Sequence, residues 1–185
     1  MISPLERLNT LSRGEAEARF LSCCGSPKWA RRMTEERPFR DGEEFQEAAD
    51  RVWRALPERE WREAFAAHPR IGASAPDSAA GTGPADLHPP PNDGRSKEWS
   101  REEQAGTKSA SAETLENLTD ANRKYEQRFG HIFIVCASGK SAAEMLALLD
   151  SRLHNDARTE LAIAAEEQRK IMLLRLARLL EAEGA

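Results

Sequence analysis

Long apolar runs and a cysteine framework are both missing from this chain of 185 residues. No apolar segment approaches the ~20 residues that a membrane-spanning helix needs, and the N-terminus MISPLERLNT lacks the basic and apolar regions of a signal peptide. The three cysteines include two neighbours, and they give neither an even set for disulfides nor the spacing of zinc ligands. We therefore expect a soluble, cytoplasmic protein without a membrane partner.

Basic clusters are also scarce. The formal net charge is -4, with 27 lysines and arginines against 31 acidic residues. A nucleic-acid partner needs clustered Lys and Arg to neutralise phosphates. The adjacent Arg31 and Arg32 are followed by Glu35 and Glu36, which indicates a solvated helix face. We expect no nucleic-acid partner.

The residues that are abundant favour helices. Hydrophobic residues make up 39% of the chain and charged residues 31%, enough apolar material for a core under a polar surface. Ala, Leu, Glu and Arg dominate, whereas Val and Ile are few, a bias that favours helix over sheet. The length suits one domain. The composition therefore predicts an all-α single domain.

Capping residues mark where most of the expected helices begin. Ser and Asp side chains accept hydrogen bonds from the unpaired N–H groups of a first helical turn, and proline fits the first helical position. The sites with such a signal are Ser12, Ser26, Asp41, Pro57, Ser141 and Asp156. Gly25 is placed to end the first of these helices. Apolar residues after Asp41 recur at steps of three and one, which is typical of an amphipathic helix.

Two segments depart from the helical pattern. The 24 residues from Gly72 to Arg95 hold five prolines and four glycines, so they predict a long loop or flexible insertion that folding does not need. A loop of this length is either a lid or a tolerated insertion. The run from His131 to Ala137 is short, branched and apolar, but no second strand is visible to pair with it. We expect this run to be a buried crossing with extended or partly helical backbone.

His68 is the first candidate for chemistry. Pro69 follows it, and because the residue before proline avoids the α conformation, a helix must end there. A histidine at a helix C-terminus can titrate near neutral pH and act as a general acid or base. The structural alternative is a histidine that caps the last carbonyls of the helix.

Ser100 and Glu103 form the pattern S-x-x-E. This pattern is typical of a capping box at a helix start. A functional interpretation places Glu103 and Gln104 in a first helical turn, whose free N–H groups attract anions.

Two arginines lie on expected apolar stripes. Arg152 and Arg158 need partners if they are buried, either a structural carboxylate or a substrate carboxylate. Glu166 and Glu167, by contrast, predict a solvated face.

Several motifs occur together in a recognisable order. They are His68-Pro69-Arg70-Ile71-Gly72, Ser100-x-x-Glu103-Gln104-x-Gly106, Tyr125-x-x-x-Phe129-Gly130, Arg152-Leu153-x-Asn155 with Glu160, Lys170-Ile171 and Arg175-Leu176. With these motifs the chain resembles the 2-oxo-4-hydroxy-4-carboxy-5-ureidoimidazoline (OHCU) decarboxylase family over nearly its whole length. The link between the first two motifs is longer here than is usual in that family.

The resemblance implies an all-α single compact domain over residues 1–185, with about eight packed helices, usually a homodimer. It implies a carboxy-lyase of urate degradation that converts OHCU to (S)-allantoin and CO2 with no metal and no organic cofactor. His68 and Glu103 would be catalytic. Pro69, Ser100, Gln104, the backbone near Val135 and Arg152 would bind the substrate, with Arg158 as the other choice of arginine.

Two other classes of function stay open at this point. One is a helical interaction module in which every residue singled out is structural. The other is a metal-dependent hydrolase that uses His68, Glu103 and a further histidine, although no H-x-x-x-H or E-x-x-H pair supports it.

Overall fold

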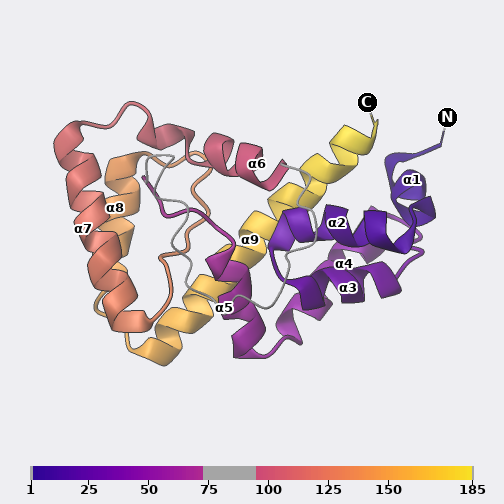
Figure 1. Cartoon of the computed structure of the whole chain (residues 1–185), viewed down its shortest axis with the longest axis horizontal. Coiled ribbons are helices and arrows are strands. Elements are labelled where there is room, and N and C mark those ends of the chain that lie inside the picture. The colour runs from indigo at the N-terminus through magenta and orange to yellow at the C-terminus, as the bar shows by residue number, and fades with distance from the viewer. Residues whose placement is uncertain (1, 73–94, 185) are drawn as a thin grey trace. The chain divides into compact units, whose positions relative to one another are not determined.

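The computed structural model describes residues 2–72 and 95–184, and within these ranges the regular structure is entirely helical (Figure 1). The α-helices of this part are α1 (Pro4–Thr10), α2 (Arg13–Cys24), α3 (Pro27–Glu35), α4 (Gly42–Arg54), α5 (Glu58–Ala66), α6 (Arg95–Glu103), α7 (Ala112–Phe129), α8 (Ala142–Arg152) and α9 (Ala157–Gly184), with a short 3-10 helix η2 (Ala105–Thr107). The predicted all-α fold is confirmed. Residues 73–94 lie outside the described part, so the flexible insertion expected over 72–95 stays a prediction.

The predicted caps begin the helices as expected. The Asp41 carboxylate accepts the N–H of Glu44 at 2.9 Å at the start of α4, and the Ser141 hydroxyl accepts that of Glu144 at 3.3 Å at the start of α8. Gly25 ends α2 with a φ of 77°, a left-handed conformation that glycine adopts without steric cost. These ends are fixed by residues within one turn of them.

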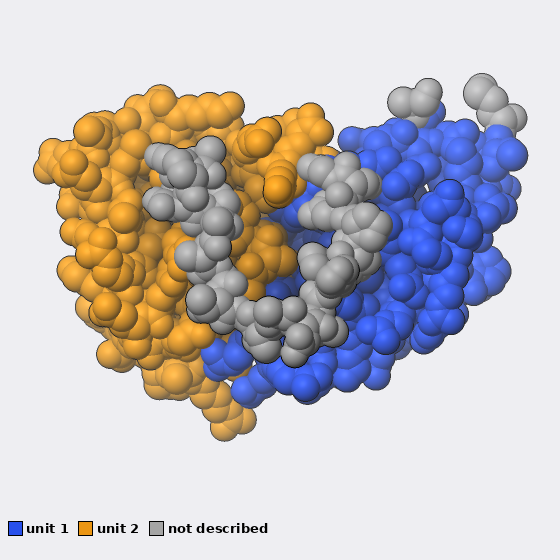
Figure 2. All heavy atoms as spheres, viewed as in Figure 1, with its two compact units in different colours: residues 1–64, 89–96, 169–185 blue, residues 65–88, 97–168 orange. Residues whose placement is uncertain are grey.

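The chain divides into two compact units (Figure 2), and the boundaries between them fall within α5, within α6 and within α9. Unit 1 contains residues 1–64, 89–96 and 169–185. Its core is rich in aromatic rings, for example Phe20 edge-on to Trp29 with ring centroids 5.9 Å apart. The Arg37 side chain donates to the carbonyls of Leu8 and Leu11 at 2.8 and 2.9 Å. It therefore satisfies carbonyls that the end of α1 leaves unpaired.

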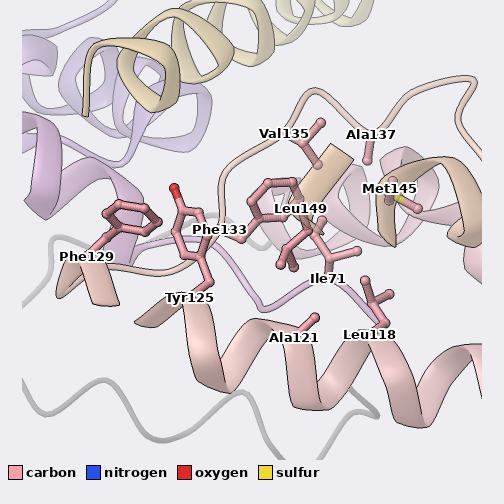
Figure 3. Close-up of a cluster of buried hydrophobic side chains, with 10 residues drawn as sticks. All are labelled: Ile71, Leu118, Ala121, Tyr125, Phe129, Phe133, Val135, Ala137, Met145 and Leu149. Carbon is pink, nitrogen blue, oxygen red and sulfur yellow. The ribbon is translucent and has the colours of Figure 1, made fainter. Parts of the chain in front are cut away.

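Unit 2 contains residues 65–88 and 97–168, and every predicted site residue belongs to it. Helices α7 and α8 pack against each other there. Their apolar faces enclose a buried cluster (Figure 3) made of Ile71, Leu118, Ala121, Tyr125, Phe129, Phe133, Val135, Ala137, Met145 and Leu149. Residues 132–137 contribute to this cluster while forming neither helix nor strand. The predicted buried crossing is thus confirmed.

Within residues 2–72 and 95–184, no helix is both long enough and apolar enough to cross a bilayer.

Candidate functional site

The His68–Gly72 segment is anchored on α7. Helix α5 ends at Ala66, and the His68 N–H donates to the carbonyl of Phe65 at 3.0 Å. Arg70 makes a two-pronged ion pair with Glu126 of α7, with N–O distances of 2.6 and 2.9 Å. Bidentate pairs of this kind fix orientation as well as position. The helix end predicted before Pro69 is confirmed, and the half-buried His68 stands on a backbone held by its neighbours.

Gly72 links this segment to the Ser100–Gln104 segment. Its N–H donates to the side-chain oxygen Oε1 of Gln104 at 3.2 Å. Its φ is 76°, and an added Cβ would lie 2.9 Å from Leu118 Cδ2, so a larger residue would be strained as well as crowded. The two motifs, 32 residues apart in the sequence, are therefore joined directly.

The predicted capping box at Ser100 is wrong. Helix α6 already begins at Arg95, Ser100 lies inside it, and Glu103 is its last residue. The N–H of Gln104 donates to the Ser100 carbonyl at 3.1 Å, an ordinary helical bond. Trp99 is buried, and this tertiary packing stabilises helix upstream of the S-x-x-E pattern. Glu103 and Gln104 thus follow a helix rather than open one, and the expected attraction of anions to a first turn does not apply.

The short helix η2, which follows α6, packs tightly on the loop that precedes α8. A Cβ added to Gly106 would lie 2.0 Å from the backbone oxygen of Lys140, so only glycine fits there. This close approach brings Glu103 near the buried crossing. Burial raises the pKa of the Cys136 thiol, and the carboxylates of Glu167 and Glu103 add to that rise. The buried Glu103 carboxylate is thus within electrostatic reach of the crossing.

The comparisons with known proteins decide the family. The sequence pattern that defines OHCU decarboxylases matches residues 9–177 of this chain. The chain belongs to the OHCU decarboxylase family. The family predicted from the motifs is therefore confirmed.

Curated relatives match over part of their own length. The uric acid degradation bifunctional protein TTL of Arabidopsis thaliana is 37% identical over 157 residues, which are 85% of this chain and 45% of that protein. The OHCU decarboxylase of Amia calva is 37% identical over 73 residues, which are 40% of this chain and 42% of that protein. The matches thus span less than half the length of these relatives.

Two solved structures share the fold. A crystal structure of OHCU decarboxylase in the presence of (S)-allantoin has a TM-score of 0.71 and 34% identity, covering 89% of this chain and 98% of that chain. A structure of (S)-allantoin synthase has a TM-score of 0.67, covering 95% of this chain and 53% of that chain. At 16% identity the second likeness shows the fold alone.

Arg152, which the family resemblance suggests as a substrate ligand, lies in a buried ion pair. Its Nε donates to Glu160 Oε1 at 2.8 Å, and its Nη1 donates to the carbonyl of Ile134 at 2.8 Å. The Tyr125 hydroxyl donates to the same carboxylate oxygen. The structural partner considered from the sequence is therefore present. The role of Arg152 toward a substrate stays a prediction.

The remaining residues singled out from the sequence differ in how deeply they are buried. Val135 is buried in the core cluster, whereas Arg158 is exposed at the start of α9. The predicted solvated face is wrong for Glu167. This residue is half-buried, and its Oε2 accepts a hydrogen bond from the N–H of Cys136 at 2.7 Å. Sequence reasoning missed this contact, since a bond between residues 31 apart leaves no local pattern.

The residues described here contain no group of three or more His, Cys, Asp or Glu side chains placed to hold a metal ion.

The close approach of Gly106 gives a testable prediction for this OHCU decarboxylase family member. We expect Gly106→Ala to lower the free energy of unfolding by about 1–3 kcal/mol, because the new methyl group must displace backbone rather than a side-chain end. Turnover should fall as well, since the displacement moves the segment that carries Glu103. Gly14→Ala is the control, because an added Cβ there meets nothing within 4 Å. Equal urea midpoints for Gly106→Ala and wild type would contradict the packing described.

Proposed function

We propose that this chain catalyses the decarboxylation of OHCU to (S)-allantoin and CO2. The observation that carries the proposal is the family match over residues 9–177. The direct link between Gly72 and Gln104, which joins two of the family's motifs, supports it. We infer further that residues 1–185 act as one OHCU decarboxylase-like domain, in the cytoplasm and as a homodimer. Light scattering of the purified protein tests the dimer.

The substrate supplies its own electron sink. The bond between the ring carbon and the carboxylate breaks, CO2 leaves, and the electron pair moves onto the adjacent C=N bond. A proton then adds to one face of the ring. The protein has to orient the carboxylate, stabilise developing charge and direct that proton.

The proposed site residues divide these tasks. His68 exchanges a proton with the hydroxyl or carboxylate of the substrate, and Glu103 fixes the imidazole tautomer or the ureido N–H groups. Pro69, Ser100 and the backbone at Val135 contact the ring. The side-chain oxygen of Gln104 accepts the Gly72 N–H, which leaves the side-chain NH2 as a donor for a ligand. That NH2 is the donor we assign to a ring or ureido oxygen.

The reaction itself provides the test. Urate, urate oxidase and hydroxyisourate hydrolase generate fresh OHCU, and this protein should accelerate CO2 release in proportion to its concentration. Release at the uncatalysed rate over a wide range of protein concentration would contradict the proposal.

Activity is expected to be independent of metal ions, because the C=N bond already accepts the electrons. Turnover should be unchanged after dialysis against a strong chelator. If activity is lost and then restored by zinc or manganese, the metal-dependent hydrolase becomes the better interpretation.

A further inference from the structure

The backbone of the buried crossing lacks the partners that a strand normally has. The side chains of Phe133, Val135 and Ala137 all enter the core cluster (Figure 3), and this spacing of two is the period of an extended backbone. Residues 132–137 nevertheless pair with no other strand in the part of the chain that the structure describes. Buried backbone N–H and C=O groups need partners, so their hydrogen bonds must go elsewhere.

Charged side chains satisfy one edge of this backbone. The carbonyl of Ile134 accepts from Arg152 Nη1 at 2.8 Å. The N–H of Cys136 donates to Glu167 Oε2 at 2.7 Å, and the carbonyl of Cys136 accepts from Lys140 Nζ at 2.7 Å. Consecutive residues of an extended chain present their polar groups to opposite edges. These three bonds, on alternate residues, therefore hold a single edge.

The opposite edge carries the polar groups of Phe133, Val135 and Ala137, with Val135 at its centre. This residue is 4% exposed, and within the described ranges neither its N–H nor its carbonyl takes part in a hydrogen bond. A buried amide without a partner is costly unless a ligand completes it. An N–H beside a carbonyl matches the amide-like groups of an imidazolinone ring.

Hydrogen bonds to a buried carboxylate fix the orientation of the Arg152 guanidinium. Glu160, which is fully buried, accepts from Arg152 Nε on one carboxylate oxygen and from Asn155 Nδ2 at 2.8 Å on the other. Arg152 Nη2 donates to the same Glu160 oxygen as Nε, so the guanidinium is fixed with Nη1 directed at the Ile134 carbonyl.

We propose that Arg152, Lys140 and Glu167 are positioning residues that hold the 134–136 backbone so that the Val135 edge meets the substrate in one register. They act through the backbone and do not touch the substrate. The inference rests on the proposed function for the identity of the substrate. It assigns to Arg152 a role different from that of a direct ligand.

Glu167 provides the sharpest test, because two substitutions separate position from charge. In Glu167→Gln the side-chain oxygen can still accept the Cys136 N–H, whereas in Glu167→Ala it cannot. We expect Glu167→Ala to raise KM for OHCU, and to weaken binding of (S)-allantoin in calorimetry, by about tenfold, the factor typical of one charge-assisted hydrogen bond. Glu167→Gln should stay within about threefold of wild type, since a neutral bond still holds the register.

The controls separate positioning from simple loss of folding. Assays are run well below each variant's melting temperature, because partial unfolding lowers the apparent kcat and leaves KM unchanged. Glu181→Ala makes the same change at an exposed position of α9 and should match wild type. If Glu167→Ala does not fold, Lys140→Met removes the donor to Cys136 while keeping the aliphatic stem. It too should raise KM several-fold.

The results distinguish this inference from the proposed function. Wild type alone tests the function, and the variants relative to wild type test the positioning. If folded Glu167→Ala keeps the KM and the allantoin affinity of wild type within twofold, the inference is wrong. It is also wrong if Glu167→Gln is as damaging as Glu167→Ala, because charge rather than position would then matter.

Discussion

His68→Asn is expected to reduce turnover of OHCU by about 10²–10⁴-fold, the range typical of a lost general acid or base. The loss of stability should be small, because the half-buried side chain follows the end of α5 and is outside the core cluster. The backbone bond from residue 68 to Phe65 survives the change. Initial rates of allantoin formation and a thermal melt measure the two effects separately.

The matched control for this variant is His154→Asn. His154 is exposed in the turn after α8, so neither rate nor melting temperature should change. A His68→Asn variant that melts many degrees lower and retains activity in its folded fraction would show that the histidine is only a cap.

Glu160→Ala is expected to give the largest loss of stability, about 3–5 kcal/mol. The carboxylate is fully buried between Arg152, Asn155 and the Tyr125 hydroxyl. Removing it leaves a buried guanidinium without its counter-charge, and the Tyr125 hydroxyl loses its acceptor. Burial and the bond to Glu160 both raise the pKa of Tyr125, so the hydroxyl stays protonated. A protonated hydroxyl in the core needs a hydrogen-bond acceptor. Urea denaturation measures the effect.

An exposed ion pair serves as the comparison. Asp120 and Arg123 lie one turn apart on α7 with side chains 63% and 66% exposed. Asp120→Ala should therefore leave the urea midpoint unchanged. If Glu160→Ala were equally mild, the buried network would not stabilise unit 2 as described.

The helix boundaries that depend on neighbouring residues could be predicted from the sequence. Asp41, Ser141 and Gly25 act on groups within one turn, and their side chains or conformations determine a helix end locally. The buried crossing was also predictable, because the short and mostly apolar run from His131 to Ala137 has no partner strand in the sequence and allows few alternatives.

The start of α6 could not be predicted in this way. The S-x-x-E pattern at Ser100 is the same whether it opens a helix or lies inside one. Trp99 is buried within α6, and this tertiary contact stabilises helix upstream of the S-x-x-E pattern. The surroundings of Glu167 were missed for a similar reason, because its partner Cys136 is remote in the sequence.

The handedness of the product tests the central claim most directly. With urate oxidase and hydroxyisourate hydrolase supplying OHCU, circular dichroism follows the appearance of allantoin with and without this protein. We predict rapid formation of dextrorotatory (S)-allantoin at a rate proportional to the wild-type protein, and close to the uncatalysed rate with His68→Asn. A racemic product formed at the uncatalysed rate in the presence of folded wild type would contradict the account.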